Sequence, residues 1–146
     1  MAEQTPQTLQ NHTRMVPLYH YLAMPILLIN LLLSLYAVVT GFSIHTALNV
    51  LVAIALLLLA YFARVFALGA QDRVIRLEER LRMQQLLPED LKPRITEFTT
   101  QQLVALRFAS DAELPQLAQR VLDEDIGERK AIKQLISTWR ADYQRV

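Results

Sequence analysis

The chain of 146 residues contains no cysteine and only three glycines, and these absences exclude several kinds of chemistry. Without cysteine there is no disulfide, no thiolate nucleophile and no cysteine-ligated zinc site. The glycines stand alone at positions 41, 69 and 127, so no glycine-rich loop can cradle a phosphate. The HExxH and GxSxG motifs are also missing. We therefore expect a protein that is not an enzyme and that holds no metal or cofactor.

Charge is nearly missing from two long stretches of the chain. Residues 18–39 have no charged side chain, and residues 47–68 have only Arg64, near the end of that stretch. A bilayer core about 30 Å thick needs roughly 20 apolar residues in a helix. Both stretches reach that length, and a short loop separates them. The pattern predicts an all-α membrane protein whose two transmembrane helices form a hairpin.

Lysine and arginine are absent from the loop of residues 40–46 but flank the two apolar stretches on their other sides. Arg14 precedes the first stretch, and Arg73, Arg76 and Arg80 follow the second. Positively charged flanks remain on the cytoplasmic side of a membrane. We therefore expect a multi-pass protein with both termini in the cytoplasm.

Prolines divide the rest of the chain. Pro25 is expected to kink the first helix. The second helix meets no breaker before Pro88, so we expect it to continue into the cytoplasm. Beyond it, we expect helices near residues 99–109, 110–123 and 128–139, the middle one starting with a capping box from Ser110 to Glu113. The predicted parts are a cytoplasmic tail (1–16), a transmembrane hairpin (17–70), a cytosolic continuation of the second helix (71–87) and a small cytoplasmic helical domain (88–146).

An uninterrupted heptad stripe runs along the second helix. Its members alternate in steps of four and three: Asn49, Ala53, Leu56, Ala60, Ala63, Ala67, Ala70, Val74, Leu77 and Leu81. Small residues allow close helix packing in lipid, and larger apolar ones form a seam in water. The stripe predicts a surface that joins copies or partners. Alternatively, the first helix and the C-terminal domain of the same chain cover it.

Two charge pairs on the second helix, Asp72 with Arg76 and Glu78 with Arg82, have the i,i+4 spacing that stabilises an exposed helix. Arg107 and Arg140 are expected to pair with acidic residues of the C-terminal domain. From Pro88 onward, acidic and basic residues nearly balance, which argues against nucleic acid as a partner.

Polar side chains in the first apolar stretch are few. Asn30 lies near its middle, and Ser34 follows one turn later. Together with Asn49 they could line a substrate or ion path in an oligomer. The interpretation we favour is a hydrogen-bonding contact between helices, because no acidic residue or lysine accompanies them at that depth.

Several polar residues gather around the start of the first helix: Asn11, His12, Arg14 and His20. They could contact an anionic lipid headgroup or a partner. His12 and His20, supplied by several copies, could also hold a metal or haem, although two histidines with this spacing are a weak signal.

The chain resembles a family of small bacterial membrane proteins known only as a domain of unknown function, some of whose members carry transporter-permease labels. The resemblance rests on Gln10 to His12, Arg14, Pro17, His20, Gln102 to Pro115, Lys130 to Lys133 and Trp139 to Val146. It implies two transmembrane helices, a cytoplasmic helical domain, the inner (plasma) membrane of a bacterium and no particular activity. It also implies that Asn11, His12, Arg14 and the stretch from Arg107 to Pro115 matter to the function.

These observations predict a non-enzymatic membrane scaffold or accessory subunit. Its partners would be the lipid bilayer and either further copies of itself or a larger membrane complex. The alternative function is a small oligomeric channel or a transporter component.

Overall fold

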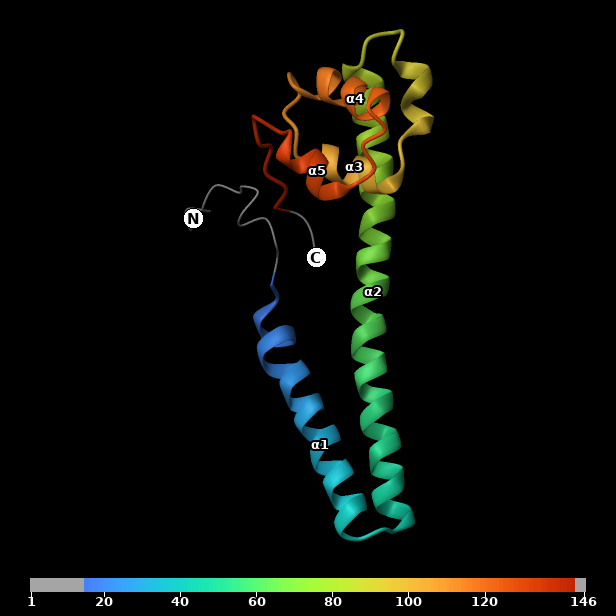
Figure 1. Ribbon diagram of the computed structural model, residues 1–146, viewed down its shortest axis with the longest axis vertical. Coiled ribbons are helices and arrows are strands. Elements are labelled where there is room, and N and C mark those ends of the chain that lie inside the picture. Colours follow the sequence, from blue (N-terminus) through green and yellow to red (C-terminus); the bar gives the residue numbers. More distant parts are fainter. Residues whose placement is uncertain (1–14, 144–146) are drawn as a thin grey trace. The chain divides into compact units, whose positions relative to one another are not determined.

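The computed structural model describes residues 15–143, which are all-helical apart from turns and one isolated bridge (Figure 1). The elements in chain order are η1 (Leu18–Ala23), α1 (Met24–Thr40), α2 (Ile44–Leu86), η2 (Lys92–Glu97), α3 (Thr100–Leu106), α4 (Leu114–Asp123) and α5 (Arg129–Gln134). The chain forms two compact units, which we describe separately. The apolar unit is Arg14–Leu68, and the C-terminal unit begins at Gly69, so that α2 contributes to both.

Just before Pro25, where a kink is expected, the helix type changes. The π-helix η1 leads directly into α1, and the Met24 N–H donates to the carbonyl of Tyr19, five residues earlier. Proline has no N–H, and its ring crowds the carbonyl four residues before it. A wider π turn just ahead of Pro25 accommodates both effects without ending the helix.

α2 is a single helix of 43 residues, about 64 Å long at 1.5 Å per residue. At its start, the Ser43 N–H donates to Thr46 Oγ1 (2.9 Å) and the Thr46 N–H donates to Ser43 Oγ (3.1 Å). The helix ends at Leu86, two residues before Pro88, which confirms that it continues well past its apolar stretch. Leu18–Thr40 and α2 are both long and apolar enough to cross a membrane.

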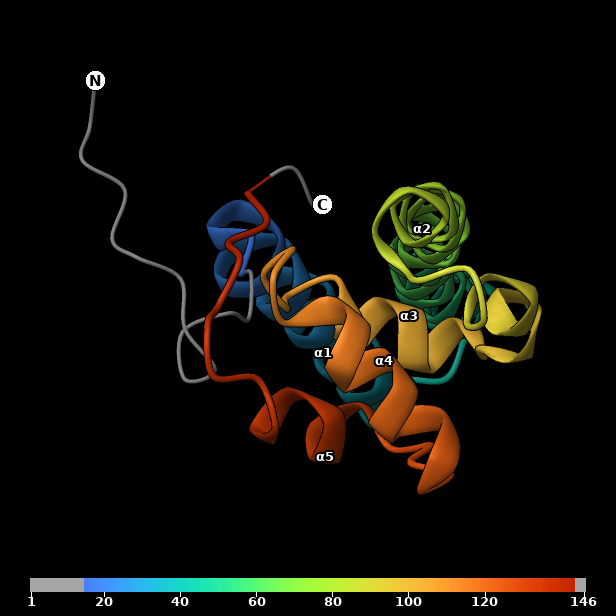
Figure 2. The ribbon, with the colours of Figure 1, turned by 90° about the horizontal axis from the view of Figure 1, so that it is seen from above.

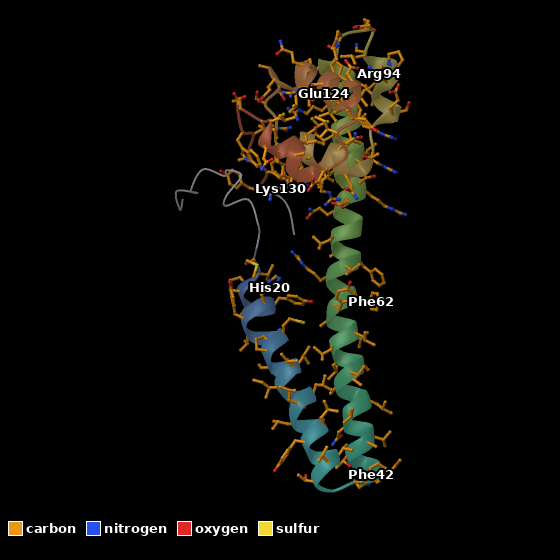
Figure 3. The ribbon with its side chains drawn as sticks, viewed as in Figure 1. His20, Phe42, Phe62, Arg94, Glu124 and Lys130 are labelled. Carbon is orange, nitrogen blue, oxygen red and sulfur yellow. The ribbon has the colours of Figure 1, made fainter. Side chains whose placement is uncertain are left out.

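The surface of the apolar unit is itself apolar. Only 6% of the most apolar window of each long helix is buried. Figure 3 shows side chains built almost entirely of carbon around both helices between the labels His20 and Phe42. Ala53 is the one fully buried position in this part of α2. These helices are therefore not the core of a globular unit formed by this chain alone.

The C-terminal unit has its own hydrophobic core. Figure 2 shows α3, α4 and α5 gathered beside the last turns of α2. The core consists of Met83, Leu87, Leu91, Ile95, Phe98, Leu103, Ala105, Leu106, Ala109, Leu114, Leu117, Ala118, Val121 and Ile132. A capping box starts α3, because the Gln102 N–H donates to Thr99 Oγ1 while the Thr99 N–H donates to Gln102 Oε1.

Two predicted helix boundaries in this unit are wrong. α4 begins at Leu114 rather than Ser110. Ser110 Oγ does accept a hydrogen bond from the Glu113 N–H (3.3 Å), but the Glu113 carboxylate does not complete the capping box. It accepts instead from the backbone N–H groups of Ser137 (2.8 Å) and Thr138 (2.9 Å). Pro115, which suits only a first helical turn, marks the later start.

α5 ends at Gln134 rather than near Trp139. The backbone after it is extended because it bonds elsewhere. The Ser110 N–H donates to the Thr138 carbonyl (3.1 Å), and the Arg140 N–H donates to the Phe108 carbonyl (2.7 Å). Ala109 and Trp139 form an isolated antiparallel bridge between these segments. The last described residues are thereby attached to the end of α3.

Candidate functional site

The predicted stripe on α2 divides into covered and uncovered positions. Ala53 is buried, and Ala60 and Ala67 are half-buried. The other members are exposed, namely Asn49, Leu56, Ala63, Ala70, Val74, Leu77 and Leu81. Most of the predicted stripe is therefore exposed, and the stripe is not the face of α2 that the rest of the described chain covers.

The C-terminal unit packs on the opposite face of α2. Its buried positions there repeat every four residues at Ile75, Glu79, Met83 and, just past the helix end, Leu87. Val74, Leu77 and Leu81, which we call the open stripe, stay 54%, 61% and 58% exposed. The alternative in which the C-terminal domain covers this half of the predicted stripe is therefore wrong.

Two exposed charges border the open stripe. Arg73 lies on one side of it and Glu78 on the other, and neither side chain has an ion pair among residues 15–143. The charge pairs expected within α2 are wrong, because one member of each pair has another partner. Asp72 accepts from Arg129 (3.0 Å). Arg82 pairs with Glu79 (2.9 Å) and Asp111 (2.6 Å).

Asn30 lies on the exposed face of α1, and Ser34 is half-buried. Within the described part of the chain, the Asn30 side chain makes no hydrogen bond. An exposed amide surrounded by leucines is unusual for a surface in contact with hydrocarbon, where polar groups need partners. The helix contact expected of Asn30 is therefore not made among residues 15–143.

The candidate residues at the start of the first helix are only partly described. Asn11, His12 and Arg14 lie outside the described residues. His20 Nδ1 lies 3.1 Å from the Val16 N–H and 2.9 Å from the Val16 carbonyl oxygen. Next to it, the Tyr19 hydroxyl donates to the carbonyl of Ala60 (2.7 Å), 41 residues away in the sequence. Tyr19 thus ties η1 to the middle of α2 within the apolar unit.

A buried ionic cluster lies in the C-terminal unit, with Glu79 at its centre. The Glu79 residue is only 4% exposed. Its carboxylate accepts from Arg82 Nη1 (2.9 Å) and lies 3.6 Å from Arg140 Nη1. Arg107 pairs with Asp142 at 3.3 Å. Both arginines that the sequence predicted to find acidic partners, Arg107 and Arg140, therefore do so.

These side chains border a cavity of about 580 Å³. It is lined by Ile75, Glu78, Glu79, Arg82, Arg107, Arg140, Ala141, Asp142 and Tyr143. Burial raises the pKa of the Glu79 carboxyl above its ordinary value, and Arg82 and Arg140 oppose that rise. A carboxylate with a raised pKa in a cavity can mark a functional site. Here both oxygens face guanidinium groups, so the cluster attaches Arg140, and with it the last described segment, to α2.

Sequence reasoning did not find Glu79 as the centre of this cluster. The two cations beside its carboxylate are Arg82 and Arg140. Only Arg82 is close in sequence, and its i,i+3 spacing from Glu79 is also common for ion pairs on exposed helices. Among residues 15–143, no three histidine or acidic side chains gather in a way that could hold a metal ion.

The described residues define a class of protein: an all-helical chain with two helices long and apolar enough to cross a membrane. They assemble no catalytic group, so the fold indicates this class and not an activity. Within that class, the chain belongs to a family described as a family of unknown function (DUF6526), whose model matches residues 1–146. This confirms the resemblance to a family of unknown function. No curated protein and no solved structure matches the chain.

Proposed function

We propose that the protein is a membrane scaffold or accessory subunit that assembles through the exposed stripe on α2. The observation that carries the proposal is the open stripe. Three large apolar side chains remain more than half exposed on a helix whose opposite face is covered by the chain's own core. Apolar residues in a row on a helix are stable in water when another helix covers them.

The apolar unit supports a location in the membrane. Its two helices are long enough to span a bilayer and are covered by apolar side chains that the rest of the chain does not bury. Lipid removes that surface from water, and the loop at Gly41–Ser43 lets the helices insert as a hairpin. The arginines around the apolar stretches favour cytoplasmic termini, and the family resemblance favours a bacterial inner membrane.

Asn30 gives independent support for a partner within the bilayer. A polar amide that faced lipid would lose its hydrogen bonds with water and gain none. A partner helix with a carbonyl or amide at the same depth supplies them, at a net gain of roughly 0.5–2 kcal/mol. A channel would use the same amide to line a pore, but Asn49 lies much nearer the loop than Asn30, so the two do not form one polar ring.

Native mass spectrometry of the protein gently extracted from its own membrane tests the proposal. We expect an assembly, composed of further copies or of other subunits. The double variant Leu77→Gln with Leu81→Gln should release at least roughly tenfold more monomer, while Arg76→Gln, at an exposed position of α2 outside the open stripe, should not. A wild-type protein that is monomeric and without partners, or an assembly that the double variant leaves intact, would overturn it.

Flux measurements in liposomes decide between scaffold and channel. A scaffold should pass no ions at any oligomeric state. Ion flux that disappears in the Asn30→Leu variant would replace the scaffold with a channel, because a pore lined by that amide loses its polar contact when leucine takes its place.

A further inference from the structure

We infer that the occupant of the open stripe is a second copy of this chain, joined as a parallel, in-register, two-stranded coiled coil. The inference rests on the proposed function and names the partner that binds there. It is carried by the heptad positions of the exposed residues and by the charges beside them. It does not depend on the apolar stripe alone.

The open stripe fixes the heptad register. With Val74 at position a, Leu77 is at position d and Leu81 at the next a, and Ala70 is at the preceding d. All of these positions are exposed on α2. A β-branched residue at a followed by leucine at d is the pattern that favours two strands in parallel coiled coils. The Val74–Leu77 step has this pattern and favours a dimer.

The same register gives the bordering charges their positions. Arg73 is at position g and Glu78 at the following e. In a parallel coiled coil, a g residue lies beside the e residue five positions later on the other strand. Each Arg73 would therefore meet a Glu78 of the second copy, and the two-fold symmetry makes this pair twice. Both side chains are exposed and have no ion pair in the described part of the chain, so they are available for it.

Charge also excludes the antiparallel arrangement. Antiparallel strands bring g positions beside g positions, so Arg73 of one copy would lie near Arg80 of the other. Like charges at these positions oppose association. Two copies inserted in one membrane with the same topology are parallel without any further constraint. Because α2 is already helical, association does not have to nucleate a new helix.

Single cysteines test the register directly, since the chain has no cysteine of its own. Ala70→Cys and Leu81→Cys, introduced separately into the full chain in its native membrane, should each form a disulfide-linked dimer when treated with a copper–phenanthroline oxidant. In the antiparallel pair that brings Arg73 beside Arg80, position 81 of one copy would instead lie beside position 70 of the other. Arg76→Cys, at position c and away from the axis, is the matched control and should stay monomeric.

A charge exchange tests the Arg73–Glu78 pairing between copies. Arg73→Glu and Glu78→Arg, each in the Leu81→Cys background, should lower the yield of linked dimer by roughly threefold or more, because each brings like charges together. The double exchange restores opposite charges and should return the yield to near that of the Leu81→Cys parent. These positions do not pair within one chain, so recovery reports a contact between two copies.

The outcomes separate this inference from the proposed function. If neither cysteine variant forms a dimer while native mass spectrometry shows an assembly with another protein, the second copy is wrong and the scaffold stands. If dimers form but the double exchange does not recover them, the parallel register is wrong. A monomer without any partner overturns both.

Discussion

The Arg82 guanidinium on α2 binds the Asp111 carboxylate, 29 residues later in the chain, through both Nε (2.8 Å) and Nη2 (2.6 Å). The same side chain donates to Glu79 (2.9 Å) and to the backbone carbonyl of Ala109 (2.7 Å). The Arg82 side chain is 11% exposed and Glu79 6%, so their bond is largely shielded from water, whereas Asp111 is 66% exposed. One arginine therefore connects α2 to the segment that follows α3.

Replacing Arg82 should strongly destabilise the C-terminal unit. Arg82→Ala leaves the buried Glu79 carboxylate with only Arg140 as a cation, and breaking a buried pair costs about 3–5 kcal/mol. Denaturant unfolding of the full chain, followed by the fluorescence of the single tryptophan, measures the change. Arg76→Ala, on the same helix but exposed, should stay within about 0.5 kcal/mol. Equal stability of the two variants would show that the Arg82 bonds contribute little.

Glu79 should make the stability of the C-terminal unit depend on pH. Its pKa is raised above 4.5 in the folded chain, so the folded state holds the proton more tightly than the unfolded state does. Between 4.5 and the raised pKa, the free energy of unfolding therefore falls as pH rises. Thermal unfolding as a function of pH should show this component in the wild type and lose it in Glu79→Gln.

The matched control for that experiment is Glu89→Gln, because the Glu89 side chain is 88% exposed. It should leave the pH profile of the wild type unchanged. A Glu79→Gln profile that overlays the wild-type curve between pH 4.5 and neutrality would contradict the assignment.

Phe108 should be a key packing residue for the last described segment. It is fully buried and stacks on Trp139, with ring centroids 4.6 Å apart. The Arg107 guanidinium lies 4.5 Å from the centroid of the Phe108 ring. Phe108→Ala should cost about 3–5 kcal/mol and shift the Trp139 emission to longer wavelength, because the indole loses its cover. Gln101→Ala, an exposed position on α3, should change neither; an unshifted spectrum in the Phe108 variant would count against the stack.

Tyr19 should restrain the separation of the first helix from α2 in the apolar unit. Tyr19→Phe removes the hydroxyl that donates to Ala60, at a cost of about 1 kcal/mol. Spin labels on cysteines introduced at Leu18 and Leu59 would report the distance between the helices, and their distance distribution should broaden. Tyr21→Phe, whose ring is 68% exposed, is the control. A distribution that does not change in Tyr19→Phe would show that the hydrogen bond is dispensable.

The sequence predicted the features that depend on neighbouring residues. The two apolar helices follow from the length and hydropathy of local segments, and the end of α2 follows from Pro88. Prediction from the sequence failed where two segments far apart in the chain compete for the same hydrogen-bonding group. Ser110 and Glu113 have the spacing of a capping box, but the Glu113 carboxylate binds the N–H groups of Ser137 and Thr138 instead. A local sequence motif gives no information about hydrogen-bond partners that lie far away in the chain.

The face of α2 that packs in the C-terminal unit was also decided by the tertiary structure. From the sequence, Val74, Leu77 and Leu81 form the more apolar face, while the face that includes Ile75 and Met83 carries Glu79 and looks unsuitable for burial. The folded chain buries that second face because Arg82 and Arg140 pair with Glu79. The sequence by itself determined that α2 exists and how long it is, since helix formation is local. Which face is covered, and which stays open to a partner, depended on charges that only folding brings together.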